Sequence, residues 1–489
     1  PSQAEYRQEA QLQALFWEEI GWTWYNNGDN AQARQCLEHG EQLLQEASIR
    51  AGTAWASLRY QYSSICWQEG SYDEALRAAY EALKLFEEAL SQPQTERTAP
   101  LSTRVQRTLK GDPVDLGRVH RLLAAIQATV GKTAEAITHL HTALAISEQF
   151  DHKRDIAISS SNLGDAYLRR AEYPLAQAAL RRSLHLGEQI GDVPLVSVVF
   201  SNLGELAARI GNLKEAEEWF KKSLELAERF NDQVYMSWWK AKLALVLQEL
   251  GNLPEAFACI RKALLIARSI HNPACIGLAL VALSNIRIIQ AITVGGEESS
   301  AYSTMKLNAS PKSMHFIVNA RKSLQKGLAL EGLEADTRIE GQLVLAQALL
   351  LQSELESARQ QSNSALEHAA SYELTWLLAR SQRMLGSILA LQGQQEQSAL
   401  YFEQAINTFE KCGMRLEWAR ALLSFGETLI QYGEATEASY QQGLHHLQES
   451  VQVFRDCDAK LDLQMAEDIL SRYTRAASGL ARKSARKRS

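Results

Sequence analysis

The chain has 489 residues, of which 46% are hydrophobic and 22% are charged, and its formal net charge is −6. A chain with this hydrophobic content and only 9 prolines is not of the intrinsically disordered class, and its 27 glycines are too few for a fold of many short strands and turns. The acidic balance disfavours duplex DNA as a ligand of the main body, because phosphate contacts require clustered Lys and Arg.

Two stretches, residues 161–192 and 201–232, are near copies of each other, and both begin with the letters SNLG. In the second copy a large apolar residue precedes a small one at Leu203-Gly204, a turn residue follows at Gly211, and an alanine comes at Ala216. We find this order ten times along the chain, with its alanine missing from repeat seven, and the small residues of the ten repeats are Gly21, Ser63, Ala124, Gly164, Gly204, Ala244, Ser284, Ala346, Gly386 and Gly426. The pattern therefore predicts one continuous array of repeats.

The spacing within each repeat is typical of a packed helix pair. The small residue allows the second helix to cross close to the first, and the large residue before it fills the space toward the next repeat. Glycine at the turn supplies the positive φ that ends the first helix. Apolar residues then recur at helical spacing in the second helix, as at Ala216, Phe220 and Leu224.

In chain order, residues 1–90 hold repeats one and two, and residues 91–114 form an inserted loop. Residues 115–292 hold repeats three to six and the first helix of repeat seven. A second inserted loop follows at 293–314. Both loops are rich in Ser, Thr, Pro or Gly, and they are either passive surface excursions or segments that bind a partner.

The C-terminal part begins with residues 315–458, which complete repeat seven and hold repeats eight to ten. A capping helix is predicted at 459–476, because the open end of a solenoid core must be covered. A basic tail follows at 477–489, and residues 471–489 together hold seven Lys or Arg and no acid. The tail is either a solvated extension or a contact for nucleic acid or another acidic surface.

The large-small pair, the turn glycine and the Ala-x-x-x-Phe positions at Ala216 and Phe220 resemble the tetratricopeptide repeat (TPR). Most repeats are 40 residues apart, which is similar to the arrays of kinesin light chains, bacterial peptide-sensing regulators and MalT-like transcription activators. The resemblance covers essentially the whole chain. It implies an all-α fold, a right-handed TPR-like superhelical solenoid of about ten helix pairs with a C-terminal capping helix.

The sequence contains none of the motifs GxxxxGK[ST], GxGxxG, HExxH or GxSxG, and no histidine has Cys or carboxylate neighbours at a metal-ligand spacing. We therefore expect a protein that is not an enzyme and that needs no cofactor or metal. The six scattered cysteines are typical of a reducing, cytoplasmic compartment. The most apolar window of the sequence, residues 276–294, contains Asn285, Arg287 and Gln290, so no membrane association is expected.

In TPR-like stacks the first helix of each pair lines the concave groove. Positions six and three before the small residue, and one and four after it, are therefore expected to face inward. Near the N-terminus these positions hold the aromatic residues Trp22, Tyr25, Tyr60 and Trp67. Further along they hold Arg118, Arg121, Asp165, Glu205, Trp238, Asn285, Gln347, Arg380, Arg383, Arg420 and Glu427.

Two uses of these side chains stay open at the level of sequence. The aromatic residues either pack between repeats or offer rigid anchors for a peptide or a small ligand. Arg380, Arg383 and Arg420 either bind a ligand's carboxylate or phosphate bidentately or are solvated or neutralised by nearby glutamates.

Asn162 and Asn202 lie two positions before the small residue in successive repeats. In similar 40-residue repeats an asparagine at this position hydrogen-bonds the backbone of a bound peptide, because its amide offers both a donor and an acceptor. Lys242 and Leu122 occupy the equivalent positions in the flanking repeats, so the expected ladder is only two residues long.

These expectations favour a non-enzymatic sensor or scaffold that captures a protein, a peptide or a small-molecule effector in its groove. The resemblance to MalT-like activators and other STAND-class signalling ATPases implies the regulatory arm of a larger bacterial protein, with a P-loop module upstream of Pro1. Two alternatives are a free-standing peptide-binding adaptor and a nucleic-acid-associated regulator that uses the basic tail.

Overall fold

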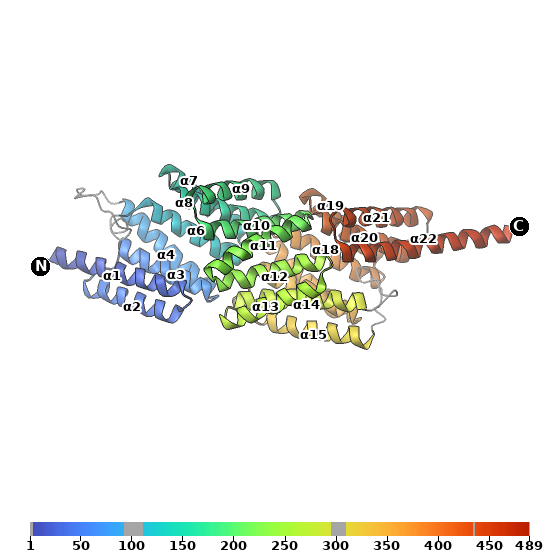
Figure 1. The fold of residues 1–489 in the computed structure, drawn as a ribbon, viewed down its shortest axis with the longest axis horizontal. Coiled ribbons are helices and arrows are strands. Elements are labelled where there is room, and N and C mark those ends of the chain that lie inside the picture. The colour runs from blue at the N-terminus through green and yellow to red at the C-terminus, as the bar shows by residue number, and fades with distance from the viewer. Residues whose placement is uncertain (1–2, 92–110, 295–309, 434–435, 489) are drawn as a thin grey trace. The chain divides into compact units, whose positions relative to one another are not determined.

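The computed structural model describes residues 3–91, 111–294, 310–433 and 436–488, and the regular structure within these ranges is helical throughout (Figure 1). The helices form ten consecutive pairs followed by one final helix. This confirms the predicted all-α, TPR-like solenoid of about ten pairs. The two predicted inserted loops fall largely on residues 92–110 and 295–309, which lie outside the described residues.

The first four pairs are α1 (Gln3–Asn26) with α2 (Asn30–Glu46), α3 (Thr53–Gln68) with α4 (Tyr72–Ser91), α6 (Pro113–Thr129) with α7 (Thr133–Gln149), and α8 (Lys153–Arg169) with α9 (Tyr173–Ile190). The next three are α10 (Val193–Ile210) with α11 (Leu213–Phe230), α12 (Gln233–Glu249) with α13 (Leu253–Ser269), and α14 (Pro273–Val294) with α15 (Pro311–Leu328). The last three are α16 (Ala335–Leu351) with α17 (Leu355–Ser371), α18 (Thr375–Leu391) with α19 (Gln395–Cys412), and α20 (Arg415–Tyr432) with α21 (Glu437–Asp456), and α22 (Lys460–Arg488) follows.

The chain divides into two compact units. The N-terminal unit comprises Pro1–Ala166 and Ala178–Val196, and the C-terminal unit comprises Tyr167–Gln177 and Ser197–Ser489. Each has its own hydrophobic core, in which side chains from both helices of a pair meet those of the neighbouring pair. Burial of these side chains supplies the main driving force for stacking the pairs.

The turn inside most pairs has the predicted left-handed backbone. Six of the predicted turn glycines have φ between 79° and 89°, and these are Gly28, Gly70, Gly131, Gly211, Gly251 and Gly393. Ala171 and Ser353 adopt the same conformation, at φ 60° and 63°. Because two residues with a Cβ accept this backbone, the packing of the helix pair sets the turn geometry. Glycine only lowers the free-energy cost of the left-handed conformation.

Two turn positions depart from the pattern. Ala291 lies inside α14, which continues to Val294, so the first helix of repeat seven runs past the predicted turn position. Gly433 has φ −65° and an extended backbone instead of a left-handed one. The first departure lies beside the second inserted loop, where the insertion removes the need for a tight turn at the usual place.

The predicted small residues mark places of close helix approach. A Cβ added at Gly204 would lie 3.1 Å from the Phe220 ring, and one added at Gly386 would lie 3.0 Å from the Phe402 ring. Phe425, a large residue of the predicted large-small pair, stacks on Phe402 of the preceding pair with ring centroids 5.3 Å apart. The small residue thus packs against its own second helix, and the large residue packs against the repeat before it.

The final helix begins at Lys460, one residue after the predicted start of the capping helix, and it ends at Arg488, well beyond the predicted end. Ala466 and Ile469 of α22 are buried in the same core as Phe454 of α21, so the first part of α22 covers the last pair. α22 then continues to Arg488, through nearly all of the predicted basic tail. The tail sequence is rich in Ala, Arg and Lys, which are strong helix formers, and this explains why the backbone stays helical.

Within the described part of the chain, two helices, α10 and α14, are long and apolar enough to cross a membrane by composition. In α14, 78% of the most apolar window is buried inside the structure, where it forms part of the C-terminal unit's core. Its hydrophobic character is therefore accounted for by packing between helix pairs.

Candidate ligand-binding groove

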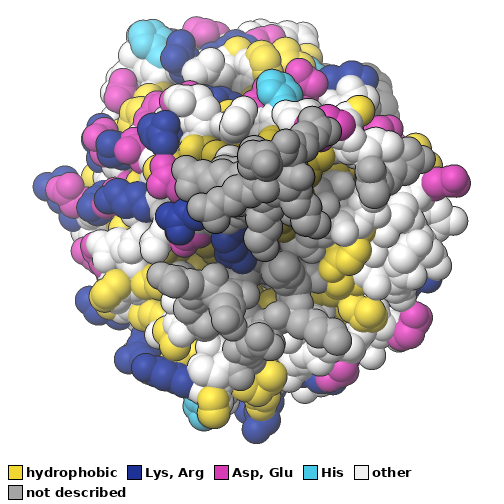
Figure 2. All heavy atoms as spheres, turned by 90° about the vertical axis from the view of Figure 1, so that its right-hand side faces the viewer, with side chains coloured by type: hydrophobic (Ala, Val, Ile, Leu, Met, Phe, Trp, Pro, Cys, Tyr) yellow, Lys and Arg dark blue, Asp and Glu magenta, His cyan; other side chains and the backbone are white. Residues whose placement is uncertain are grey.

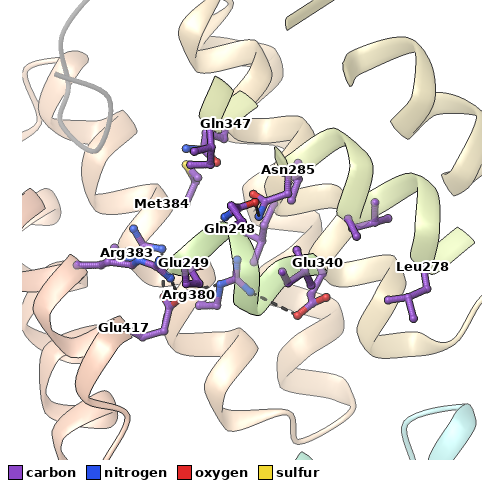
Figure 3. A pocket seen from close by; sticks show the side chains of 17 residues that line it. Gln248, Glu249, Leu278, Asn285, Glu340, Gln347, Arg380, Arg383, Met384 and Glu417 are labelled. Carbon is purple, nitrogen blue, oxygen red and sulfur yellow. Dashed lines mark hydrogen bonds and ion pairs between the residues drawn. The ribbon is translucent and has the colours of Figure 1, made fainter. Parts of the chain in front are cut away.

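The first helices of five consecutive pairs, α12, α14, α16, α18 and α20, surround a cavity of about 150 Å³ in the C-terminal unit (Figure 3). Charged, amide and apolar side chains all line this cavity. The polar lining consists of Gln248, Glu249, Asn285, Glu340, Gln347, Arg380, Arg383, Glu417 and Arg420. The apolar lining includes Leu278, Ile289, Leu343 and Met384.

A second cavity of about 130 Å³ adjoins the first in the same unit. The wall of this second cavity includes Glu205 and Arg209 of α10, Lys242 of α12 and Trp376 of α18. Six residues line both cavities, and these are Leu245, Glu249, Glu340, Arg380, Glu417 and Arg420. A layer of paired charges therefore separates two small spaces.

Arg420 is the centre of this charged layer. Its Nη1 donates to Glu417 at 2.8 Å, and its Nη2 donates to Asp462 of α22 at 2.7 Å. The same Nη2 also donates to Glu249 of α12. Three carboxylates from three helices thus share one buried guanidinium, and the loss of that guanidinium would leave uncompensated charge in the interior.

Arg380 and Arg383 extend the layer along α18. Arg383 Nη2 donates to Glu417 at 3.2 Å, whereas Arg380 Nη1 lies 3.5 Å from Glu340 and Arg380 Nε lies 3.8 Å from Glu417. A strong charge-assisted hydrogen bond measures about 2.7–2.9 Å. The buried Nε of Arg380 has no hydrogen-bond partner in the described part of the chain. The contacts of Arg380 with carboxylates are therefore weak, and an added anion could replace them at little cost.

The position of each carboxyl in the layer sets its pKa. Burial raises the pKa of Glu417, but the three surrounding arginines outweigh burial and hold that pKa well below its usual value. Burial also raises the pKa of Glu249, to about 7. The neighbouring carboxylates Asp462 and Glu417 add to this rise, and Arg420 opposes it. Glu249 consequently takes up a proton near neutral pH.

The wall of the second cavity has its own ion pairs. Glu205 accepts from Arg209 Nη2 at 2.7 Å and from Lys242 Nζ at 3.3 Å. Burial opposes ionisation of Glu205, yet these two cations lower its pKa to about 2. The guanidinium carbon of Arg209 also lies 3.3 Å from the centre of the Trp376 ring, a cation–π contact between α10 and α18. These contacts fix the side chains around the cavity in place.

Three amides form a separate part of the first cavity's wall. Asn285 Nδ2 donates to Gln248 Oε1 at 3.2 Å. Figure 3 shows Gln248, Asn285 and Gln347 together on one side of Arg380 and Arg383. An amide offers both a donor and an acceptor, which are the groups that a peptide main chain requires.

The predicted aromatic residues of the N-terminal unit contact one another and the core. Trp22 stacks on Tyr25 with ring centroids 5.2 Å apart, and on Tyr60 with centroids 6.4 Å apart. Trp67 Nε1 donates to Thr129 Oγ1 at 3.1 Å, and its ring packs against the hydrophobic core between α3 and α6. Trp67 therefore has a packing role, whereas Trp22, Tyr25 and Tyr60 form one aromatic group on the predicted inward face.

The predicted arginines of the N-terminal unit are paired with aspartates. Arg118 Nη1 donates to Asp115 at 2.8 Å, and Arg121 Nη2 donates to Asp155 at 2.6 Å. Arg121 is buried. Neighbouring aspartates therefore neutralise the charge of both arginines.

The remaining predicted residues lie outside the two cavities. Asn162 belongs to the N-terminal unit and Asn202 to the C-terminal unit, and both are half-buried. Trp238 packs against the core of the C-terminal unit, and its buried indole N–H has no hydrogen-bond partner among the described residues. Neither Asn202 nor Trp238 is among the described residues that line a cavity.

Sequence reasoning placed Asn285, Gln347 and the three arginines of α18 and α20 on the inward face, and the structure brings these five together around one cavity. It missed the carboxylates that hold the arginines, together with Lys242, Arg209 and Trp376. Trp376 and Glu417 lie ten and nine positions before their small residues, one helical turn beyond the predicted stripe. Extending that stripe by one turn toward the N-terminus of each helix finds these two residues.

The ten helix pairs and their polar groove define this chain as a TPR-like helical-repeat scaffold. A family model described as the MalT-like TPR region matches residues 117–300, so the chain resembles the sensor region of MalT-like proteins there. No curated protein sequence matches this chain.

Several solved structures are similar in fold. The human IFIT1 dimer with m7Gppp-AAAA is 14% identical with a TM-score of 0.46, over 97% of this chain and 94% of that chain. A Rap protein complexed with competence and sporulation factor is 12% identical with a TM-score of 0.45, over 83% of this chain and 99% of that chain. BtubC from P. vanneervenii is 21% identical with a TM-score of 0.35, over 49% of this chain and 90% of that chain.

Proposed function

We propose that this chain is a sensor whose C-terminal unit binds a small polar effector, or the end of a short peptide, in the two adjoining cavities. The observation that carries the proposal is the buried layer of arginines and glutamates between the cavities, with the amide cluster beside it. Solvated surface charges would not require six converging first helices to hold them. A ligand that carries both an anionic and a cationic group matches this lining best.

The size of the cavities limits the ligand. Each cavity is smaller than the usual ligand pocket of about 300–1,000 Å³. A single amino acid, a small effector or the terminal residue of a peptide therefore fits, whereas a longer peptide would leave most of its chain outside. The anionic group is expected to bind Arg380, whose present contacts are long, while the amides of Asn285 and Gln347 hold the adjacent polar groups.

The charged layer also connects the proposed ligand site to the final helix, α22. Asp462 of α22 is held by Arg420, which lines both cavities. An anion that engages Arg380 competes with Glu417, and we expect the released Glu417 to draw Arg420 away from Asp462 and so weaken the attachment of α22 to α20. The final helix is thus the element whose position we expect to change when the groove is filled.

We further propose that the chain acts in the cytoplasm as the regulatory arm of a larger bacterial STAND-type signalling ATPase or transcription regulator. The match of residues 117–300 to the MalT-like TPR region supports this assignment. An effector-binding repeat array is useful to such a protein because differential affinity for two states of the array shifts an equilibrium in the attached module.

Native mass spectrometry of the chain, incubated with the peptide and small-molecule fraction of its own host's lysate, tests ligand binding. We expect the wild-type chain to retain an adduct below about 1 kDa, and Arg380→Gln to lose it. Arg182→Gln is the matched control, because Arg182 is an exposed, ion-paired arginine of the N-terminal unit. A wild-type chain that retains nothing, or an adduct that survives Arg380→Gln, contradicts the proposal.

Nucleic acid is a less well supported partner. On the face drawn in Figure 2, the described Lys and Arg side chains are interspersed with Asp and Glu side chains. Duplex binding requires clustered cations, and the densest run of Lys and Arg in the sequence is residues 477–489, so this alternative places the contact there. Removal of residues 479–489 would then abolish a binding signal that falls steeply with salt.

A further inference from the structure

The second cavity is lined by two arginines whose hydrogen bonding is incomplete within the described part of the chain. Among the described residues of this lining, the buried side-chain atoms without a hydrogen-bond partner are Nη1 of Arg209 and Nε of Arg380. Both atoms are guanidinium donors. A buried donor without an acceptor costs free energy, and a charged donor costs more than a neutral one. The lining therefore has an excess of donors, which an acceptor-rich ligand would satisfy.

The present partners of these arginines leave one side of each guanidinium available. Arg209 Nε donates to Glu205 Oε1 at 2.8 Å, and Arg209 Nη2 lies 2.7 Å from the same oxygen. Glu205 therefore occupies the forked edge of Arg209, which is the edge that a carboxylate normally binds. The contacts of Arg380 are long, at 3.5 Å from Nη1 to Glu340 and 3.8 Å from Nε to Glu417. A ligand would thus meet a single N–H group on Arg209 and a weakly held donor on Arg380.

The preceding repeat shows what Arg209 lacks. Arg169 lies forty residues before Arg209, at the same place in its own repeat. Its Nη1 donates to Asp336 at 3.1 Å, and its Nη2 donates to Glu334 at 3.3 Å. Forty residues after Asp336 the chain has Trp376, and the guanidinium of Arg209 lies over this ring. The indole binds the face of the guanidinium, but it supplies no acceptor to the N–H groups as the equivalent carboxylate does.

The same indole brings the two arginines close together. The guanidinium carbon of Arg209 lies 3.3 Å from the centre of the Trp376 ring, and that of Arg380 lies 5.7 Å from it. The two carbons are consequently at most 9.0 Å apart, which is the sum of these distances. One tetrahedral oxyanion, with a hydrogen bond of about 2.8 Å to each arginine, spans roughly 8–10 Å between guanidinium carbons. A single anion can therefore bridge the pair.

We propose that the second cavity holds a phosphoryl group, of inorganic phosphate or of a small phosphate monoester, between Arg209 and Arg380. Lys242 of α12 lines the same cavity and adds a third cation, with its Nζ 3.3 Å from Glu205. The oxygens of a phosphoryl group point in different directions, so they accept single hydrogen bonds from donors on α10, α12 and α18. A carboxylate binds best to a complete fork, which Glu205 already fills on Arg209. This inference rests on the proposed effector site and names the chemistry of its anionic group.

The charge and size of the cavity agree with such a group. Equal numbers of cations and carboxyls line it, and these are Arg209, Lys242, Arg380 and Arg420 with Glu205, Glu249, Glu340 and Glu417. Because the pKa of Glu249 is raised to about 7, this carboxyl is neutral in part of the molecules at neutral pH, and the cations then exceed the anions by one. The volume of about 130 Å³ suits a group of a few heavy atoms and not a whole drug-sized ligand.

Isothermal titration calorimetry of the full 489-residue chain tests the proposal, with inorganic phosphate, glucose 6-phosphate and acetate as separate titrants. We expect saturable binding of a phosphate titrant below about 10 mM, and binding of acetate that is at least about 10-fold weaker. The phosphate titrant that binds more tightly identifies the source, free phosphate or a monoester. Glu205→Gln should raise the association constant by roughly 3-fold or more, because it frees the forked edge of Arg209 and removes one negative charge.

Variants without the arginines give the second test. Replacing Arg209 alone would leave Glu205 buried without its main partner, so the paired variant Arg209→Gln/Glu205→Gln removes both charges together. This paired variant should lower the association constant for phosphate at least about 10-fold, and so should Arg380→Gln. Circular dichroism verifies that both variants are folded. Arg182→Gln is the control that should bind as the wild type does, because Arg182 is an exposed, ion-paired arginine of the N-terminal unit.

The outcomes separate this inference from the proposed function. The phosphoryl site is overturned by a chain that binds neither phosphate titrant, by acetate binding of equal strength, or by phosphate binding that survives the paired variant. A lysate adduct that is lost with Arg380→Gln but contains no phosphorus keeps the effector site and refutes the phosphoryl group. Phosphate binding that the paired variant abolishes, without any lysate adduct, supports the phosphoryl site and contradicts the effector sensor.

Discussion

Replacing Glu249 with glutamine should stabilise the protein, and the gain should depend on pH. Glu249 is a buried carboxyl whose pKa is raised to about 7, because burial and two neighbouring carboxylates outweigh its bond to Arg420. A raised carboxyl pKa means that the folded state binds more protons than the unfolded state. Stability from this group is therefore lost as the pH rises from about 4.5 toward 7, and the loss stays constant above 7.

The magnitude follows from the two pKa values. The carboxyl pKa is 4.5 in the reference state and about 7 in the folded state. At pH 8 ionised Glu249 costs about 3 kcal/mol of folding free energy, whereas at pH 5, where the folded state keeps its proton, the cost is about 1 kcal/mol. Glutamine keeps an acceptor for Arg420 and removes the charge. The gain from Glu249→Gln should therefore be about 2 kcal/mol larger at pH 8 than at pH 5.

Urea denaturation followed by far-ultraviolet circular dichroism at the two pH values measures this difference. Glu403→Gln is the control, since Glu403 is an exposed glutamate of α19 and should change stability little at either pH. An equal effect of Glu249→Gln at pH 5 and pH 8 would refute the reasoning, because it would mean that the folded protein does not hold a proton at this carboxyl. A destabilisation that grows with pH would show that the Arg420 bond dominates.

Three further outcomes can be tested by denaturation. Burial, aided by His139 at 2.8 Å between Nδ1 atoms, lowers the pKa of His120 to about 4, so stability should fall as the pH drops from 6.5 toward 4, and His120→Gln should reduce that fall by about 3 kcal/mol. Phe402→Ala empties a fully buried site and should cost about 3–5 kcal/mol, seen as a lower urea midpoint. Arg420→Met should cost about 3–5 kcal/mol at pH 8 and less at pH 5, where Glu249 is protonated; an equal cost at both would contradict the shared-cation account.

The repeat register was readable from the sequence because it rests on local rules. Large-small pairs such as Leu385-Gly386 report how closely two helices cross, and this depends on side-chain size alone. The same register placed Arg380, Arg383 and Arg420 on the inward face, since each helix turns by a fixed angle per residue. Every one of these inferences uses residues that lie within one repeat.

What could not be predicted depends on contacts between distant repeats. Arg420 and Glu249 are 171 residues apart, and no local pattern pairs them. The division into two units cuts through α8–α10, where Asn162 and Asn202 look equivalent in sequence yet belong to different units. The length of α22 depends on helix propensity in a stretch whose high charge suggested a solvated tail.

The ion pairs that span many repeats have a consequence for unfolding. In an ideal solenoid each repeat touches only its neighbours, so unfolding starts at an end and spreads repeat by repeat. In the C-terminal unit Arg169 bonds Glu334 and Asp336, which lie 165 and 167 residues away, and Arg420 bonds Glu249 in the same manner. These bonds skip the repeats between them, so fraying at one end breaks contacts made by the other. The C-terminal unit should therefore lose its helices in a single cooperative transition, as a globular domain does.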